Sequence, residues 1–450
     1  MVLGPFVEVA VILGLLSGGT LLNRDTTARF AANSSDDSRW SSPRSRSPAS
    51  RTRSPRSSPY DSDTEGGLVD DSSLLGKPRK SSSSLSSATI FHTDDASYDP
   101  TMHQRTLRLW KWRCQVWSPN TEVFKDRLLS RVLRKFPFLV EAWYWALIYW
   151  VYQLGRAFTV MFIIDGSVVE AARRHALQLV HLEQSLHLFV EVPIQQYFME
   201  SPTLMHWINR IYSFIHIPGT ILFLIVLYYV TTTRPLRQLN AIQSAGVSPQ
   251  KWKTILHNYH PDLYEKRRRT MAMCNLLAFI IFTTWPCMPP RLLSDPNLAN
   301  GDEEGLHYGF VDTVHSATGE SSVWTTNKFC NQYAAMPSLH FGYSFLIGLT
   351  IATMPLDTPT TSRRRPSLKR VLIILGALIY PATILTAIIA TANHFVLDAV
   401  AGAMVCGISW HINSALLNLL PLEDYFLWAV RIHKPSKAPL NDYYKLSPRA

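Results

Sequence analysis

Six strongly apolar segments constrain the fold of this 450-residue chain more than any other feature. They comprise residues 139–164, 208–230, 270–288, 338–356, 371–391 and 396–418. Each has about the 20 residues that an α-helix needs to cross the hydrocarbon core of a bilayer. Because helices satisfy their backbone hydrogen bonds internally, the pattern predicts an all-α, multi-pass membrane protein with a six-helix transmembrane bundle.

The loops between these segments alternate in charge. Basic residues predominate in residues 232–269 and 357–370, whereas residues 165–207 and 289–337 are acidic on balance. Short loops rich in Lys and Arg stay on the cytosolic side of a membrane. The alternation therefore places the two basic loops in the cytosol and the two acidic loops on the lumenal or external side.

The N-terminal region contains two kinds of sequence. Within residues 1–30, the apolar stretch 5–22 is either a membrane anchor or a peripheral segment. Residues 31–105 are rich in Ser, Arg and Pro and poor in large apolar side chains, which predicts a disordered cytosolic tail. Ser-Pro pairs in this tail are either kinase sites or part of a solvated spacer; they begin at Ser42, Ser47, Ser54 and Ser58. Residues 421–450 are predicted to form a cytosolic C-terminal tail.

The formal net charge of +11 suggests either nucleic acid or an anionic membrane surface as a partner. The basic residues gather in the tail and in the loops between apolar segments, which favours the membrane surface and argues against nucleic acid. The five cysteines show no spacing typical of a metal site, and we predict no metal and no cofactor. A disulfide between Cys287 and Cys330 stays an open alternative.

Residues 167–200 form an amphipathic segment that we place at the membrane interface on the non-cytosolic side. Glu183, His187 and Glu191 recur every four residues and define a polar stripe. The two glutamates are either in contact with a lipid head group or part of a solvated helix face, and the second interpretation is favoured.

Two histidines, an arginine and an aspartate lie at the predicted non-cytosolic membrane face. Arg291 follows the third apolar segment, His340 lies near the start of the fourth, and His394 lies between the fifth and sixth. Asp398 is four residues after His394, a spacing that places both side chains on one face of a helix. There the carboxylate can fix the tautomer of the imidazole and raise its basicity.

Phosphate is the ligand that this set of side chains favours. Pro337 and Ser338 are typical of a helix start, so His340 should lie near a helix N-terminus, where amides and the helix dipole attract anions. Arg291 adds a fork of N–H donors for phosphoryl oxygens. Ser338 and Asn393 complete the predicted phosphate-binding set with Arg291. The residues together predict a phosphoryl-transfer site.

The motifs Pro337-Ser338-Leu339-His340 and His394-Phe395-Val396-Leu397-Asp398 resemble those of the type 2 phosphatidic acid phosphatase superfamily. Residues 285–293, 309–313 and 393–403 resemble its inositolphosphotransferase branch, typified by fungal inositol phosphorylceramide synthase. The resemblance covers residues 139–420. It implies a six-helix membrane domain and a metal-independent reaction through a phosphohistidine.

By position, the resemblance implies that His394 is the nucleophile, Asp398 its orienting partner and His340 the acid that protonates the leaving oxygen. The chain departs from the superfamily pattern at three places. Leu339 replaces a glycine, Pro290-Arg291 stands without the preceding lysine motif, and Ile388 occupies the position of a second arginine. Leucine at position 339 is shared with the transferase branch and favours transfer over hydrolysis.

The sequence therefore predicts an integral membrane enzyme of the Golgi or another endomembrane, with its site on the lumenal face. It transfers or hydrolyses the phosphate-linked head group of a sphingolipid or phospholipid. One alternative is a lipid phosphate phosphatase, and another is a non-catalytic lipid-binding or transport protein. A haem protein with histidine ligands is a third, disfavoured because both histidines lie at the membrane rim beside an arginine.

Overall fold

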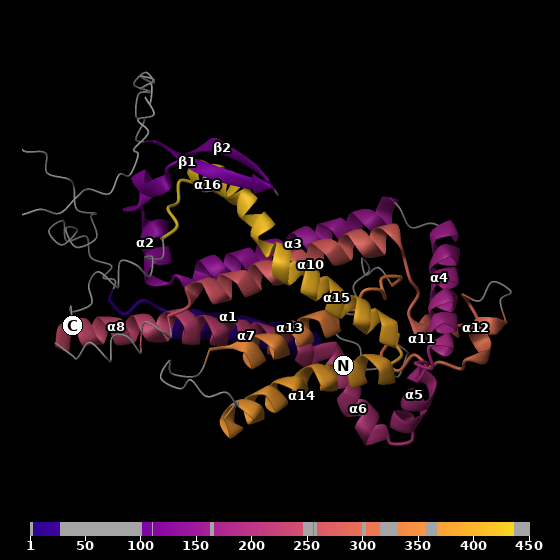
Figure 1. Cartoon of the computed structure of the whole chain (residues 1–450). Helices are drawn as coiled ribbons and strands as arrows, with labels where there is room; N and C mark the ends of the chain where they lie inside the picture. The colour runs from indigo at the N-terminus through magenta and orange to yellow at the C-terminus, as the bar shows by residue number, and fades with distance from the viewer. Residues whose placement is uncertain are drawn as a thin grey trace, which may run out of the picture. The chain divides into compact units, whose positions relative to one another are not determined.

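The computed structural model describes residues 3–27, 101–109, 111–162, 166–245, 255, 259–298, 303–315, 332–355 and 367–435. Within these ranges the chain is mostly helical, as predicted (Figure 1). It also contains a two-stranded sheet, so the all-α prediction is wrong in this detail. Most of the predicted disordered tail lies outside the described residues, and residues 102–105 of it belong to the first strand.

The elements follow one another along the chain in three groups. The first group is α1 (Leu3–Leu22), β1 (Met102–Leu109), β2 (Trp112–Pro119), η2 (Thr121–Phe124), α2 (Leu128–Lys135) and α3 (Phe138–Phe162). The second is α4 (Gly166–Ser185), α5 (Glu191–Met199), α6 (Pro202–Arg210), η3 (Ile211–Ile215), α7 (His216–Tyr228), η4 (Tyr229–Thr233) and α8 (Arg234–Ala245). The third is α10 (Pro261–Thr284), α11 (Pro290–Leu293), α12 (Glu304–His307), α13 (Leu339–Thr353), α14 (Leu368–Ala390), α15 (Val396–Ile412), η5 (Asn413–Leu419) and α16 (Leu420–Ala429).

Three helical stretches of the described chain are long and apolar enough to cross a membrane. They are Pro202–Ala241, Leu368–Ala390 and Val396–Ala429, while Phe6–Leu22 and Leu339–Thr353 are apolar but shorter. In the described residues, each of the six predicted segments overlaps a helix, and these helices are α3, α7, α10, α13, α14 and α15. The count of six membrane crossings goes beyond these three stretches and stays a prediction.

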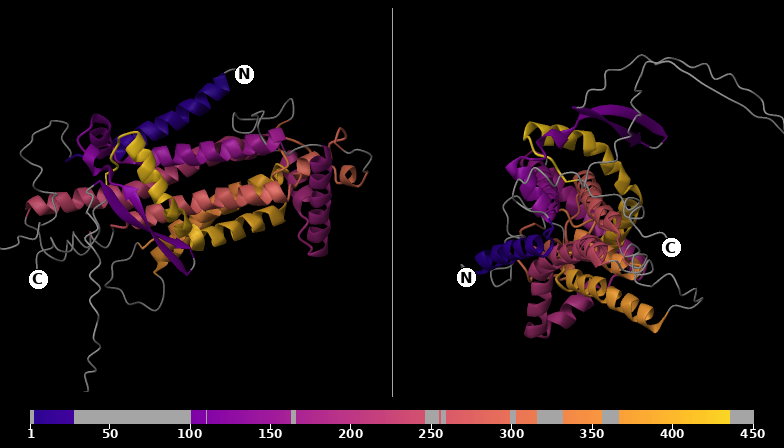
Figure 2. Two further views of the ribbon diagram at one scale, coloured as in Figure 1. Left: turned by 90° about the horizontal axis from the view of Figure 1, so that it is seen from above. Right: turned by 90° about the vertical axis from the view of Figure 1, so that its left-hand side faces the viewer.

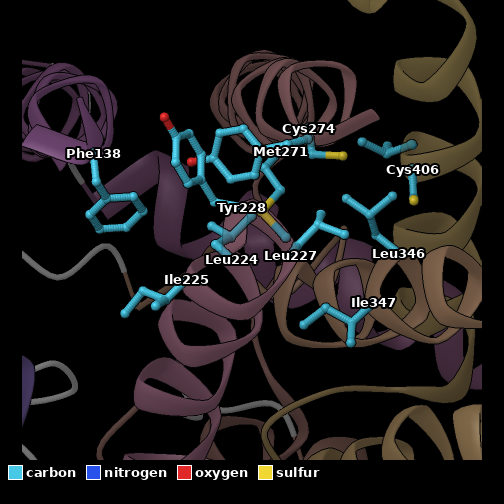
Figure 3. Close-up of a cluster of buried hydrophobic side chains, with 12 residues drawn as sticks. Phe138, Leu224, Ile225, Leu227, Tyr228, Met271, Cys274, Leu346, Ile347 and Cys406 are labelled. Carbon is cyan, nitrogen blue, oxygen red and sulfur yellow. The ribbon is translucent and has the colours of Figure 1, made fainter. Parts of the chain in front are cut away.

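The long helices pack against one another around α10. This helix contacts α3, α13 and α15, and α13 in turn packs along α14 (Figure 2). At the centre, the Tyr228 ring meets Phe138 and Tyr264 at centroid distances of 5.3 and 4.9 Å. Figure 3 shows apolar side chains from α3, α7, α10, α13 and α15 gathered in the cluster that contains Phe138 and Tyr228. Apolar packing between helices therefore forms the core. The polar residues predicted from the sequence to form a site lie beyond the ends of these helices.

The apolar N-terminal stretch forms helix α1, which packs beside α7. A Cβ atom on Gly19 would lie 2.9 Å from the Ile225 side chain, so the two helices touch closely here. Beyond the end of α1, Thr233 donates a hydrogen bond of 2.6 Å to the side chain of Asn23. The contact makes α1 part of the helical assembly, whether or not it crosses the membrane.

Strands β1 and β2 form an antiparallel hairpin in which Met102 pairs with Pro119 and Leu109 with Trp112. Arg105 holds this hairpin to α16 through two hydrogen bonds to Asp424, at 2.9 and 3.1 Å. The C-terminal segment from residue 421 therefore begins as a helix that is fastened to the hairpin.

Helices α13 and α15 approach so closely that their backbones touch. Gly402 of α15 faces the start of α13, and a Cβ atom there would collide with the carbonyl oxygen of Ser338. Gly342 faces Gly402 in return, and a Cβ atom on Gly342 would lie 3.1 Å from the Gly402 carbonyl oxygen. Small residues permit such contacts between apolar helices. The contact sets the distance between the two histidine-bearing segments.

We expect Gly402→Ala to lower the turnover strongly while the protein stays folded. The added methyl group must push Ser338 away, and such overpacking lowers the free energy of unfolding by about 1–3 kcal/mol. A displacement of about 1 Å at a reacting group lowers the rate by about 10²-fold. Turnover and thermal stability of purified Gly402→Ala would be measured beside those of Gly407→Ala. Gly407 lies on the same helix, and a Cβ atom there meets nothing within 4 Å. Equal turnover of the two variants would contradict the expectation.

Candidate active site

Three segments that are distant in sequence meet beyond the ends of the long helices. They follow α10, precede α13, and connect α14 to α15. The Cys287 amide donates to Tyr333 O at 2.8 Å, and the Ala335 amide donates to Cys287 O at 3.1 Å. The Arg291 amide donates to Ala392 O at 2.8 Å. These backbone bonds fix the segments to one another independently of side-chain identity.

The segment before α13 places His340 in the first turn of that helix, as predicted. Ser338 is the N-cap, and its hydroxyl accepts a bond of 3.4 Å from the Phe341 amide. The amide of Ser338 donates to Asp398 O at 2.9 Å. Because α13 begins at Leu339, the amides of Leu339 and His340 belong to the turn that has no intrahelical acceptor. This N-terminus is therefore suited to an anion.

His340 lies among three other rings. Tyr212 stacks on it at a centroid distance of 4.6 Å, and His216 and His394 lie at 5.1 and 5.9 Å. Tyr212 belongs to η3, a π-helical turn inside the long helix that runs from α6 to α8, and His216 follows directly. His216 also forms a 2.8 Å hydrogen bond with the Tyr380 hydroxyl. The sequence did not point to Tyr212 or His216, because a π-helical turn leaves no mark in the apolar pattern.

The relation between His394 and Asp398 differs from the predicted one. Their spacing predicted one shared helix face, but α15 begins at Val396 and His394 precedes it. Asp398 lies in the first turn, where its carboxylate accepts a bond of 2.9 Å from the Phe395 amide. The Nδ1 atom of His394 lies 2.8 Å from Ala335 O and 3.6 Å from Asp398 Oδ2. The backbone carbonyl is thus the hydrogen-bond partner of the imidazole, and Asp398 is a nearby charge.

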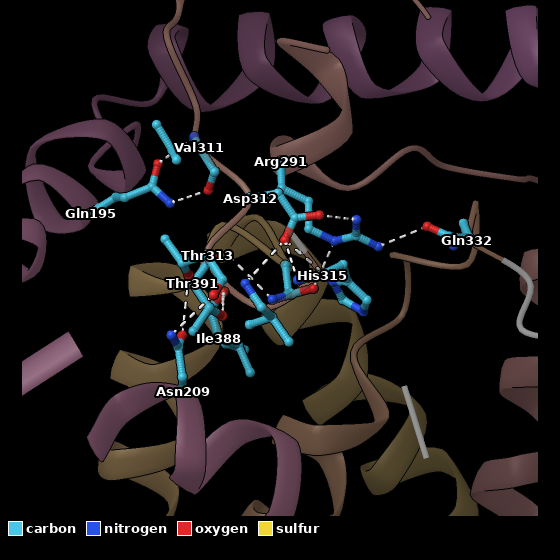
Figure 4. Close-up of polar contacts among 12 residues, drawn as sticks. Gln195, Asn209, Arg291, Val311, Asp312, Thr313, His315, Gln332, Ile388 and Thr391 are labelled. Carbon is cyan, nitrogen blue, oxygen red and sulfur yellow. Dashed lines mark hydrogen bonds and ion pairs between the residues drawn. The ribbon is translucent and has the colours of Figure 1, made fainter. Parts of the chain in front are cut away.

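Arg291 is buried and holds three acceptors (Figure 4). Its Nε donates to Asn393 at 2.9 Å, Nη1 to Asp312 at 2.8 Å and Nη2 to Gln332 at 3.1 Å. Asn393 and Arg291 are predicted phosphate-binding residues, and Asn393 fixes the guanidinium in place. A guanidinium has five N–H donors, so these contacts leave two for other ligands.

Asp312 is another residue of this site to which the sequence assigned no role. Burial alone would raise the pKa of Asp312, but hydrogen bonds from His315 and the charge of Arg291 outweigh it and hold that pKa below its usual range. Asp312 is therefore ionised at neutral pH and partly neutralises Arg291. The residue lies within the segment 309–313, which carried part of the family resemblance.

Glu183 and Glu191 do not lie on a solvated helix face, so that prediction is wrong. Both side chains are fully buried. Glu183 accepts a hydrogen bond of 2.7 Å from the Leu397 amide, and Glu191 accepts one of 2.8 Å from the Val396 amide. The predicted stripe breaks between α4 and α5, where His187 is exposed and has a φ of 57°. The reason for burial is that the first amides of α15 need acceptors.

Position 388, where the superfamily carries a second arginine, holds a fully buried isoleucine. The carbonyl of Ile388 accepts bonds from the amides of Asn393 and His394, at 3.1 and 3.2 Å. This residue shapes the turn before α15 and adds no positive charge. Among the described residues, no group of three or more His, Cys, Asp or Glu side chains is arranged to hold a metal ion. Cys287 has a free thiol, and Cys330 lies outside the described ranges.

Two histidines, a buried aspartate and a buried arginine are thus gathered beyond the ends of apolar helices, and three of the described helical stretches are long enough to cross a bilayer. A family profile described as the PAP2 superfamily matches residues 177–247 and 253–412, which is more than half of the chain. The chain belongs to the PAP2 superfamily, whose members are phosphatases and phosphotransferases that act on lipid-like substrates. No curated protein and no solved structure shows a significant match to it.

Proposed function

We propose that the chain is a multi-pass membrane phosphotransferase that moves a phosphate-linked head group between lipids through a phosphohistidine, like the inositolphosphotransferases of sphingolipid and phospholipid metabolism. The observation that carries this proposal is the placement of His394 between Asp398 and His340, with 5.9 Å between the two imidazole centroids. Arg291 is joined to the same turn through Asn393. A nucleophile, an acid and an anion-binding group are thus within reach of one phosphoryl group.

His394 attacks phosphorus through Nε2. Its Nδ1 lies against the carbonyl of Ala335, an acceptor, so Nδ1 carries the proton and the lone pair is on Nε2. When the Nε2–P bond forms, the ring becomes cationic, and the carboxylate of Asp398 at 3.6 Å stabilises that charge. His340 donates a proton to the lipid alkoxide as the P–O bond breaks. The first lipid leaves and phosphohistidine remains.

An acceptor hydroxyl resolves the phosphohistidine in the second step. His340, now neutral, takes the proton of that hydroxyl while its oxygen attacks phosphorus, and the bond to His394 Nε2 breaks. Water in place of the lipid hydroxyl would instead release the head group with its phosphate. The same two steps on a lipid phosphate monoester would release inorganic phosphate, which is the reaction of the first alternative, a lipid phosphate phosphatase. The leucine at position 339, shared with the transferase branch, supports transfer.

The phosphoryl oxygens bind at the N-terminus of α13 and to Arg291. The amides of Leu339 and His340 and the two remaining N–H donors of Arg291 supply the contacts. The hydroxyl of Ser338 accepts from Phe341 and can still donate its own hydrogen.

A non-catalytic lipid-binding or transport protein is the second candidate, and one observation favours it. Asp312 lies 2.8 Å from Arg291 and offsets its charge, while the position of the superfamily's second arginine is Ile388. The site therefore attracts a phosphate dianion less strongly than one with two unpaired arginines. Binding without conversion would follow if this attraction is too weak to stabilise the transition state.

Purified protein incubated with a panel of head-group-labelled phospholipids, with ceramide, with diacylglycerol and with neither, tests the proposal. We expect one head group to move, with its phosphate, to an added acceptor. Release of the free head group with its phosphate in every sample would identify hydrolysis in place of transfer, and a lipid phosphate phosphatase would release inorganic phosphate from a lipid phosphate added to the panel. Saturable lipid binding with no conversion would overturn the catalytic proposal in favour of the lipid-binding protein.

The proposed reaction needs no metal ion, because imidazoles, amides and a guanidinium perform every step. We expect turnover to survive EDTA and to be inhibited by vanadate, which mimics pentacoordinate phosphorus. Both are measured with the same labelled lipid. Complete loss of turnover in EDTA that Mg²⁺ restores would contradict the histidine route.

We also propose that the site lies on the lumenal face of the Golgi or another endomembrane. The alternating loop charges support this side, so a cysteine at Asn297 should be labelled from the lumenal side and a cysteine at Gln238 from the cytosolic side. Both positions are exposed. An impermeant maleimide added to sealed vesicles, before and after permeabilisation, makes the measurement. Labelling of Asn297→Cys in intact cytosolic-side-out vesicles would contradict the orientation.

A further inference from the structure

The start of α15 is surrounded by more acidic side chains than the proposed reaction uses. Glu183 from α4, Glu191 from α5 and Asp398 of α15 itself are all fully buried. Each accepts a hydrogen bond from one backbone amide at the start of the helix, at 2.7, 2.8 and 2.9 Å respectively. Only Asp398 has a part in the chemistry described above, so the two glutamates need a separate explanation.

One oxygen of each carboxyl group is left over. Glu183 Oε2, Glu191 Oε2 and Asp398 Oδ1 are buried and have no hydrogen-bond partner among the described residues when all three groups are ionised. The side chains of Glu183 and Glu191 nevertheless lie within hydrogen-bonding reach of each other. A single proton shared by the Glu183 and Glu191 side chains would give both of them the missing hydrogen bond. Two ionised carboxylates could not form this bond, because each can only accept.

The charges around this pair also favour one bound proton. The ionisable groups that act on Glu183 are Glu191 from α5, Asp398 from α15 and the Cys287 thiol from the segment after α10, all of them acidic. Burial first, and then the hydrogen bond and charge of Glu191, raise the pKa of Glu183 to about 9. Glu183 therefore holds a proton at neutral pH.

We propose that Glu183 and Glu191 are positioning residues, which share one proton and clamp the first turn of α15 so that His394 and Asp398 keep their places. The oxygens of Glu183 and Glu191 accept hydrogen bonds from the first amides of α15. Without these carboxyl groups, the same amides would be able to bind a second anion at the helix N-terminus. The phosphoryl group is thereby left to the N-terminus of α13, opposite His394. The catalytic consequence rests on the proposed function, whereas the clamp itself does not.

Glu183→Gln tests the shared proton without any assay of activity. The glutamine oxygen can accept from Leu397, and its NH₂ group can donate to Glu191, so the variant copies the protonated pair and cannot lose its proton. The wild-type folded state has the raised pKa, so its stability falls as pH rises toward that value. We expect the thermal midpoint of purified wild type to fall between about pH 6.5 and about pH 9.5, and that of Glu183→Gln to fall less.

The control is Glu170→Gln, which changes an exposed glutamate of the same helix and should follow the wild type. If Glu183→Gln loses as much stability with pH as the wild type and the control, the shared proton is refuted. This readout decides the matter even if the protein moves no head group.

Turnover tests the positioning role. Glu183→Ala leaves the Leu397 amide without its acceptor, and we expect kcat to fall by about 10²-fold with KM little changed, while Glu183→Gln keeps turnover at neutral pH. Wild-type kcat in a folded Glu183→Ala would overturn the proposal. If Glu183→Ala does not fold, the kcat of Glu183→Gln decides. A fall in that kcat of about 10²-fold would contradict the shared-proton arrangement. Absence of turnover in wild type would count against the proposed function alone.

Discussion

His394→Ala is expected to abolish both turnover and covalent incorporation of phosphate. Alanine at position 394 has no nitrogen that can attack phosphorus, so the proposed phosphohistidine cannot form. Incubation with phosphate-labelled lipid, followed by a rapid alkaline quench that preserves phosphohistidine, measures the intermediate, and lipid chromatography measures turnover. A protein-bound label should appear in wild type and disappear in the variant.

His411→Ala is the matched control for this experiment. His411 lies on the same helix as Asp398, near its other end, and is exposed. The control should keep both the label and the turnover of wild type. Wild-type turnover in His394→Ala would instead refute the catalytic mechanism, and the lipid-binding candidate would replace it.

His340→Ala is expected to slow transfer by about 10²–10⁴-fold, the usual contribution of general acid–base catalysis. The loss should depend on the leaving group, because only a poor leaving group needs a proton. A nitrophenyl phosphodiester, whose phenolate leaves unprotonated, should therefore form the phosphohistidine at a rate close to that of wild type. Single-turnover kinetics with the lipid and with the nitrophenyl substrate measure the two effects.

His216→Ala serves as the comparison for His340→Ala, because the His216 ring lies 5.1 Å from that of His340 and transfers no proton in the proposed mechanism. If His216 only supports the position of His340, its loss should slow the reaction of the lipid more than that of the nitrophenyl substrate, and by less than His340→Ala does. An equal loss on both substrates in His340→Ala would show that His340 does not protonate the leaving oxygen.

The sequence alone could predict that Arg291, His340 and His394 share one end of the helices, because apolar length and loop charge order the membrane crossings. The structure places these residues together. The sequence could not predict that Tyr212 and His216 lie beside them. A π-helical turn shifts the following side chains by about 100° around the helix without changing the composition.

The buried glutamates were missed for a different reason. A polar residue every fourth position is the pattern of a solvated helix face, and the sequence does not reveal that another helix begins against it. Glu183 is buried because the amide of Leu397, more than 200 residues away, needs an acceptor. Likewise the hairpin 102–119 has little apolar alternation, and its attachment depends on Asp424. Such long-range polar contacts are fixed by the tertiary structure.

The 2.8 Å contact between His394 and the carbonyl oxygen of Ala335 has a consequence for genetics. The group that orients the imidazole belongs to the main chain, and the side chain at that position is already a methyl group. An alanine scan would pass over position 335 without effect, and substitution of Asp398 would leave the proton on Nδ1 in place. The orientation of the nucleophile is therefore encoded in the path of the backbone, and only changes that bend this path, such as those at Gly402, can be expected to expose it.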